Sequence, residues 1–164
     1  QGDITMPFAI GGHPGFRVPL VEDDCFEDYS ITFSHPCYPD RVGFTQSGYL
    51  NGHDERFPLK DDVRLDLHHR LFYDDAIILK NVSREVKLQS KKSGKGVSLA
   101  FHNMPYLGLW HWPNIDVPYV CIEPWSSLPS RQDVVESFYG KSDMIQLDPG
   151  QTYRNTWSIT VLLG

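Results

Sequence analysis

Apolar and polar residues alternate along short segments throughout this sequence, and this pattern restricts the fold more than any other feature. Side chains of a β-strand point alternately to opposite faces, so a period of two indicates strands with one buried face. Turn-forming Gly, Pro, Asn and Asp residues separate the segments, and only 131–138 could form a helical turn or two. The sequence therefore predicts an all-β sandwich or barrel, with its clearest strands at 4–10, 29–33, 63–67, 97–101 and 153–161. Trp157 belongs to the last of these segments and is expected in the core.

Length and charge restrict the domain count and the partners. The chain has 164 residues, 40% of them hydrophobic, which suits one domain with a core and is too short to argue for two. Its net charge is −6, and its basic residues are scattered apart from a cluster at 91–95 that we interpret as an exposed hairpin tip. Without a basic stripe, nucleic acid is excluded as a partner.

The cysteines indicate the cellular compartment, and the first residues indicate how the chain begins. Three cysteines without CxxC spacing indicate a reduced, cytoplasmic protein. No apolar run has the length of a membrane span, so no membrane association is expected. Gln1-Gly2-Asp3 is followed almost at once by the first strand, without an initiator Met, so we interpret this start as a cut inside a larger domain.

His13 is the first candidate for chemistry, because it lies at the end of a predicted strand between two glycines and a proline. Glycines allow the backbone to turn tightly or approach a ligand, and proline fixes φ, so this histidine is expected on a rigid rim. A histidine in such a place can transfer protons near neutral pH. A turn histidine without a catalytic role remains the alternative.

Glu123 is the second candidate. Alternation along 118–125 places Val120 and Ile122 on one face and Cys121 and Glu123 on the other, so the glutamate ends a largely apolar strand. Partial desolvation raises the pKa of a carboxyl group and makes its ionised form a better base. The alternative is a strand-end glutamate that pairs with an arginine.

Further residues are candidates for binding a ligand. Asp75 precedes an apolar strand and could accept hydrogen bonds from sugar hydroxyls, or it could satisfy local backbone amides. Trp110 and Trp125 belong to a late aromatic cluster of the kind that stacks on pyranose rings. Two long connections, 21–28 and 37–62, are expected to line a site.

The histidines do not indicate a metal site. His68 and His69 are adjacent, and adjacent residues of a strand point to opposite faces, so they cannot share a zinc ion. The other histidines show no ligand spacing and are expected at the surface or behind a site: His35, His53, His102 and His111.

Four motifs in one order resemble the aldose 1-epimerase family, and the likeness is greatest to its bacterial subgroup linked to lactose operons. The resemblance extends over nearly the whole chain. It rests on Gly11-Gly12-His13-Pro14-Gly15-Phe16, Asp75-Ala76-Ile77-Ile78, Leu107-Gly108-Leu109-Trp110 and Cys121-Ile122-Glu123-Pro124-Trp125.

The resemblance implies a galactose mutarotase-like β-sandwich, or supersandwich, that interconverts the α and β anomers of an aldohexose of the glucose or galactose type. It implies no cofactor and no metal. By this likeness His13 is the general acid at the ring oxygen, Glu123 is the general base at the C1 hydroxyl, and Asp75 holds substrate hydroxyls.

Members of this family carry a further N-terminal portion that contributes strands and part of the sugar pocket. Nothing in 1–164 matches it, so the chain is expected to be the C-terminal portion of a single mutarotase-like domain. Missing strands or a completing chain are then expected to pair with its exposed edges.

Other functions stay open at this point. A carbohydrate-binding module without catalysis would use the same aromatic residues. A glycoside hydrolase would pair Glu123 with Asp75 across a glycosidic bond and leave His13 without a role. A purely structural fragment would fold only with a partner. Substrates with a 6-phosphate would need cationic ligands, for which the candidates are Arg41, Arg56, Arg70 and Arg131.

Overall fold

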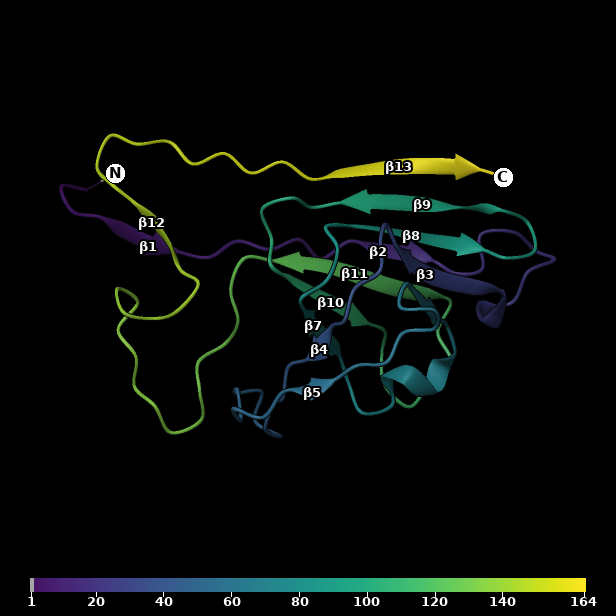
Figure 1. Ribbon diagram of the computed structural model, residues 1–164, viewed down its shortest axis with the longest axis horizontal. Helices are drawn as coiled ribbons and strands as arrows, with labels where there is room; N and C mark the ends of the chain where they lie inside the picture. The colour runs from purple at the N-terminus through teal and green to yellow at the C-terminus, as the bar shows by residue number, and fades with distance from the viewer. Residues whose placement is uncertain (1) are drawn as a thin grey trace.

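The computed structural model describes residues 2–164, and their regular secondary structure is almost entirely β-strand. The strands form three antiparallel sheets, and the helical segments of this part are the short 3-10 helices η1 (Phe26–Asp28) and η2 (His69–Phe72) (Figure 1). No helix in the described range is long and apolar enough to span a bilayer. The all-β prediction is confirmed.

The larger sheet has six strands and carries three of the candidate residues, Trp110, Glu123 and Trp125. Its order is β2-β11-β10-β7-β4-β5. The strands are β2 (Gly15–Arg17), β4 (Asp40–Arg41), β5 (Glu55–Arg56), β7 (Ile77–Lys80), β10 (Tyr106–Trp110) and β11 (Tyr119–Trp125). β10 and β11 pair along five positions with Gly108 opposite Glu123.

The second sheet has five strands in the order β13-β9-β8-β3-β6. They are β3 (Tyr29–Phe33), β6 (Arg64–Asp66), β8 (Glu85–Ser90), β9 (Lys95–Ala100) and β13 (Ser158–Leu163). β8 and β9 form a hairpin whose turn contains Lys91 and Lys92, so the predicted hairpin tip is confirmed.

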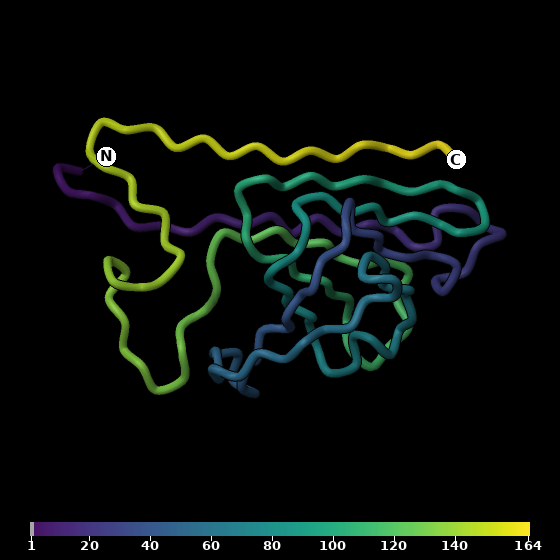
Figure 2. Tube along the Cα trace, in the orientation of Figure 1, coloured from purple at the N-terminus to yellow at the C-terminus, as the bar shows by residue number. Residues whose placement is uncertain are grey.

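A small third sheet joins two segments that are far apart in sequence. β1 (Met6–Phe8) pairs with β12 (Ile145–Leu147) at one end of the molecule, where the purple and yellow-green parts of the chain run together in Figure 2. The chain then continues into β13 along the edge of the five-stranded sheet.

The core lies between the two larger sheets, because one cluster of buried side chains contains residues from both. Ile31 and Leu88 come from the five-stranded sheet, and Leu107 and Ile122 come from the six-stranded sheet. Val120 and Ile122 are fully buried in this cluster, so the alternation predicted for β11 is confirmed. The opposite face of β11 is therefore free to carry polar groups.

The prediction for the end of the chain was wrong. Trp157 was expected in the core but is 36% exposed, and the strand begins one residue after it. Ile159, Val161 and Leu163 are also exposed, because β13 has a single neighbour and no described residue covers its apolar side chains. Alternation identifies the apolar face of a strand. Another segment must still pack against that face to bury it.

Three further predictions need correction. The strand expected at 4–10 is limited to β1, and its apolar residues Ile4, Met6 and Ile10 are exposed. The segment 131–138 forms no helix. His69 lies in η2 rather than in a strand, so the alternation argument about His68 and His69 rested on the wrong element.

His111 was expected at the surface or behind a site, and the structure buries it completely between Phe72 and Phe26. Its Nδ1 lies 2.7 Å from the carbonyl oxygen of Trp112, and its Nε2 lies 3.2 Å from Nδ1 of His69. A carbonyl oxygen can only accept, so Nδ1 of His111 carries the hydrogen, and Nε2 accepts from His69. Protonation of His111 at Nε2 would place two N–H donors, this nitrogen and Nδ1 of His69, against each other.

This burial predicts that the protein loses stability in mild acid. Desolvation lowers the pKa of His111 below its usual value, with His69 adding to the effect and Asp116 opposing it. Unfolding restores the ordinary pKa near 6.5, so the unfolded state binds more protons below that pH. We expect the free energy of unfolding to be highest above about pH 6.5 and to fall as the pH drops from there towards the folded-state pKa.

Urea unfolding at several pH values measures this dependence. His111→Gln should flatten the acid side of the curve, whereas His102→Gln, at an exposed position, should leave it unchanged. An equal acid sensitivity in the wild type and His111→Gln would contradict the assignment.

Candidate active site

His13 lies in the segment between β1 and β2, which backbone hydrogen bonds attach to β11. Gly12 N–H donates to the carbonyl of Pro124 at 2.9 Å, and Ile122 N–H donates to the carbonyl of Pro14 at 3.1 Å. Gly11 is needed for this close approach, because a Cβ there would lie 2.8 Å from Cδ1 of Trp125. The segment thereby holds His13 against the polar face of β11.

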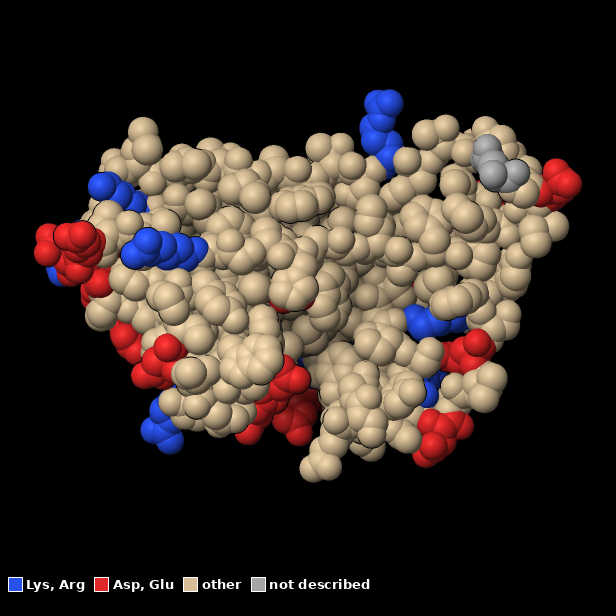
Figure 3. Space-filling model, turned by 180° about the vertical axis from the view of Figure 1, so that it is seen from behind, with Lys and Arg blue, Asp and Glu red and all other residues tan. Residues whose placement is uncertain are grey.

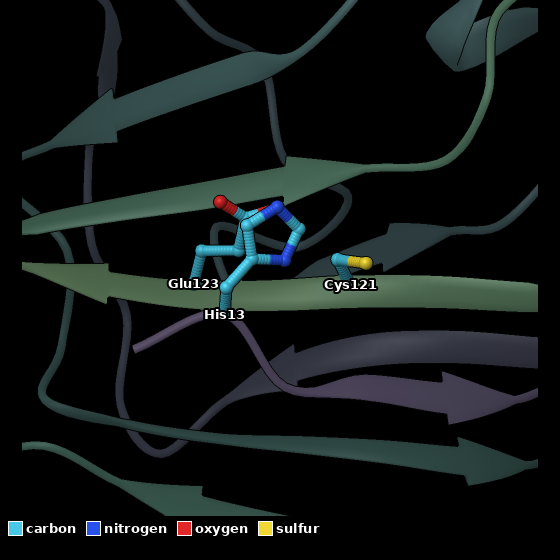
Figure 4. A group of neighbouring side chains, drawn as sticks. All are labelled: His13, Cys121 and Glu123. Atoms are coloured by element: carbon cyan, nitrogen blue, oxygen red, sulfur yellow. The ribbon is translucent and has the colours of Figure 1, made fainter. Parts of the chain in front are cut away.

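The imidazole of His13 and the carboxylate of Glu123 are in contact. Nε2 of His13 lies 3.3 Å from Oε1 of Glu123, and Figure 4 shows the ring beside the carboxylate at the surface of the strand. The His13 side chain is 63% exposed, and that of Glu123 is 5% exposed. The pair combines an exposed imidazole with a buried carboxylate.

Burial controls the protonation of Glu123. Desolvation raises the pKa of its carboxyl group, while the charge of His13 and a hydrogen bond from the indole of Trp125 lower it; the net shift is upward. The pairing with an arginine that was the alternative for this glutamate is not found; its ionic partner is His13. A raised pKa brings the carboxylate closer to the basicity useful at neutral pH.

Gly108 lies directly opposite Glu123 on the neighbouring strand β10. A Cβ at this position would lie 3.2 Å from Cβ of Glu123 and 3.3 Å from Cδ1 of Ile78. The position is tightly packed, so a side chain there would press on Glu123 and on Ile78 of the neighbouring strand β7.

Asp75 is held by a second indole. Nε1 of Trp110 donates to Oδ1 of Asp75 at 2.9 Å, and the backbone N–H of Asp75 donates to the carbonyl of Phe72 at 3.1 Å. Asp75 has a φ of 76°, a left-handed conformation that is uncommon for a residue with a side chain. The ring of Trp110 also stands edge-on to that of His13, with the ring centroids 6.0 Å apart. Trp110 therefore contacts both His13 and Asp75.

A cavity of about 670 Å³ adjoins this region and is lined by Asp75 and Trp125, although His13 and Glu123 are not part of its lining. Much of its wall comes from the connection between β4 and β5, which includes Asn51 and His53. Of the two connections that were expected to line a site, 37–62 contributes to the wall of this cavity, whereas 21–28 does not. His53 was missed because nothing in its spacing distinguishes it from other loop histidines.

Charged groups in the cavity wall are mainly acidic. Arg41 is the one candidate arginine in the lining, which also contains Glu55, Asp74 and Asp75. Arg56 instead lies 3.5 Å from Asp40 in an ion pair. On the face shown in Figure 3, lysines and arginines are scattered, as the sequence predicted.

Cys121 was not predicted as a site residue. It lies two positions before Glu123 on the same face of β11, and burial raises the pKa of its thiol to about 11. One ligand atom each from His13, Cys121 and Glu123 lies within 4.8 Å of the others (Figure 4). Alternation predicted that Cys121 shares a face with Glu123, but nothing in the sequence indicated a role for it.

The chain resembles known proteins along nearly its whole length. No protein-family model matches the chain. It is 38% identical over 165 residues to the plasmid and chromosomal forms of LacX from Lactococcus lactis subsp. lactis, an alignment that covers 99% of the chain and 54% of LacX.

Solved structures give the same result. A galactose mutarotase related enzyme from Lactobacillus acidophilus matches with a TM-score of 0.86 and 30% identity, over 98% of this chain and 54% of that one. A galactose mutarotase-like protein from Lactobacillus casei ATCC 334 matches with a TM-score of 0.78 and 29% identity, over 99% and 55%. The chain therefore spans about half the length of these relatives. It is homologous to LacX and to galactose mutarotase-like proteins, as its motifs predicted, and it has their fold over the half that it matches.

Proposed function

We propose that the protein acts as an aldose 1-epimerase on a hexose of the glucose or galactose type. The observation that carries this proposal is the 3.3 Å contact between the exposed imidazole of His13 and the buried carboxylate of Glu123. Opening a cyclic aldose requires one proton to be given to the ring oxygen and one to be taken from the C1 hydroxyl. Both oxygens are bonded to C1, so the donor and the acceptor must also be close together.

The exposed position of His13 and the buried position of Glu123 suggest which proton each residue transfers. Protonated His13 donates from Nε2 to the ring oxygen as the bond between C1 and that oxygen breaks. Glu123 takes the proton of the C1 hydroxyl, whose oxygen becomes the aldehyde carbonyl. Rotation about C1–C2 presents the other carbonyl face, and the reverse transfers close the ring as the opposite anomer. No redox step or net proton change occurs, so neither a cofactor nor a metal is required.

Binding of the sugar is assigned to three residues beside this pair. The free oxygen of Asp75 can accept from a hydroxyl, since Trp110 occupies its Oδ1. The faces of Trp110 and Trp125 offer apolar surface for the C–H face of a pyranose.

An uncharged hexose suits the cavity better than a hexose phosphate. Of the four candidate arginines, only Arg41 lines the cavity, and three carboxylates share the wall with it. Their charge would repel a phosphate dianion.

The hydrolase alternative lacks support from the geometry. Paired carboxylates would have to act together across one glycosidic bond. Glu123 contacts His13 instead, and Asp75 is engaged by Trp110. A non-catalytic sugar-binding module remains the second candidate, because the same aromatic and acidic groups would serve it.

We also propose that further strands, of the kind present in the other half of the relatives, cover the exposed side of β13. Ile159, Val161 and Leu163 are exposed there, and the chain matches 54% of LacX. Residues 1–164 would then be the C-terminal portion of one mutarotase-like domain. A cytoplasmic location stays a prediction from the cysteines, which are all free.

Polarimetry of freshly dissolved α-D-glucose and α-D-galactose tests the activity. The chain should accelerate the approach to anomeric equilibrium in proportion to its concentration. Equilibrium binding of the same sugars is measured in parallel by NMR line broadening. Saturable binding with only the buffer rate of mutarotation would favour the sugar-binding module, and the absence of both binding and acceleration would overturn the proposal.

Trp110→Phe should impair substrate binding more than catalysis. The substitution keeps an aromatic face but removes the N–H that fixes Asp75, so we expect KM to rise about tenfold while kcat changes less. Trp112→Phe is the matched control, because that indole is 61% exposed and is not bonded to Asp75. An unchanged KM in Trp110→Phe would show that the indole N–H does not position Asp75 for binding.

A further inference from the structure

Cys121 has no part in the proposed proton transfers, yet it lies beside both groups that make them. Cys121 and Glu123 share one face of β11 because they are two residues apart on a strand, and His13 reaches the same place from the adjoining segment (Figure 4). Cys121 and Glu123 are buried, and His13 faces solvent.

The spacing of His13 and Glu123 fits two ligands of a tetrahedral metal centre. Zinc–nitrogen and zinc–oxygen bonds of about 2.0–2.2 Å place two tetrahedral ligands about 3.3–3.5 Å apart. Nε2 of His13 and Oε1 of Glu123 are 3.3 Å apart. The sulfur of Cys121 completes a set of three ligand atoms that all lie within 4.8 Å of one another. Tetrahedral zinc with a Zn–S bond of about 2.3 Å needs that sulfur about 3.6 Å from the other two ligand atoms, so Cys121 would have to rotate towards them to close the site.

The ligand types define the class of metal. A thiolate with an imidazole and a carboxylate favours Zn²⁺ and related thiophilic cations, whereas Mg²⁺ and Ca²⁺ prefer oxygen ligands. Three protein ligands leave the fourth position for water on the solvent side, where His13 is exposed.

We propose that His13, Cys121 and Glu123 bind a thiophilic divalent cation such as Zn²⁺, and that the bound ion inhibits the enzyme. Binding releases to solvent the thiol proton of Cys121 and the Nε2 proton of His13, and the sulfur, imidazole nitrogen and carboxylate oxygen then each donate a lone pair to the metal. The lone pairs that would carry protons to and from a sugar are then occupied. Inhibition depends on the proposed function, but metal binding does not.

Titration with Co²⁺ tests the binding directly, because a cobalt–thiolate bond gives a charge-transfer absorption band in the near ultraviolet. We expect the band to saturate at one Co²⁺ per chain, to disappear on addition of Zn²⁺ and to persist in excess Mg²⁺. Cys121→Ser should abolish the band. His13→Ala should weaken Co²⁺ binding by more than about 10–100-fold, the loss typical of second-shell changes at metal sites.

Cys25→Ser is the matched control, because Cys25 is the exposed cysteine and the natural candidate for adventitious binding. His13 is exposed, so His13→Ala leaves no cavity in the core, and circular dichroism checks the fold of the Cys121 variant. Loss of the band in Cys25→Ser, its survival in Cys121→Ser, or an unchanged Co²⁺ affinity in His13→Ala would overturn the proposal. In the polarimetric assay, Zn²⁺ should lower the catalysed rate and EDTA should restore it; an unchanged rate at saturating Zn²⁺ would overturn the inhibition alone.

Discussion

Replacing Glu123 with glutamine is expected to lower the catalysed rate of anomer exchange by about 10²–10⁴-fold, the range typical of losing one positioned acid or base. Glutamine has nearly the same shape and can still accept from the indole of Trp125, but it cannot take the proton of the C1 hydroxyl. Since the carboxylate is buried beside His13, no other described acidic group is in ionic contact with that imidazole to replace it. We therefore expect kcat to fall much more than sugar affinity changes.

Polarimetry at saturating sugar measures this effect, and Glu22→Gln, an exposed carboxylate outside the site, controls for the change of charge. His13→Ala should show a loss of similar size. If the two residues act as one unit, the double variant should be no slower than the slower single variant. Strictly multiplicative losses would indicate that the two groups work independently, against the proposed pair.

Phe72→Ala is expected to lower the free energy of unfolding by about 3–5 kcal/mol, the usual cost of removing a buried phenyl ring. Phe72 is fully buried in the core cluster and packs on His111 with ring centroids 4.4 Å apart. The carbonyl of Phe72 also accepts the backbone hydrogen bond of Asp75, so a cavity here should loosen the turn that carries this binding residue.

Urea unfolding measures the stability change, and sugar affinity reports on the turn. Phe138→Ala is the matched control, since that ring is 63% exposed and its loss should change the free energy of unfolding by less than about 0.5 kcal/mol. A loss below 1 kcal/mol in Phe72→Ala would mean that the surrounding residues collapse into the space.

The sequence was sufficient to predict the all-β class and the two faces of β11. Both follow from local alternation, which a strand translates directly into buried and exposed positions. The resemblance to aldose 1-epimerases identified His13 and Glu123 as partners, and the structure places them in contact. Their catalytic roles, and those of Asp75, Trp110 and Trp125 in binding, stay predictions.

The failures have one physical cause, which is that burial depends on contacts between distant segments. His111 looked like an ordinary polar residue because its partners, Phe26, His69 and Phe72, come from other parts of the chain. Trp157 had the pattern of a core residue, but the sheet has no described neighbour beyond β13. Cys121 could be placed on the correct face, but its closeness to His13 depends on how 11–15 attaches to β11.

Both carboxylates of the site accept hydrogen bonds from indole N–H groups, Asp75 from Trp110 and Glu123 from Trp125. These are two of the four tryptophans of the chain; the other two, Trp112 and Trp157, are substantially exposed. The wavelength and yield of indole emission depend on such hydrogen bonds and on nearby charge. A sugar or metal ion that engages either carboxylate therefore changes the fluorescence of the unlabelled protein, and occupancy of the site can be followed optically without any added dye.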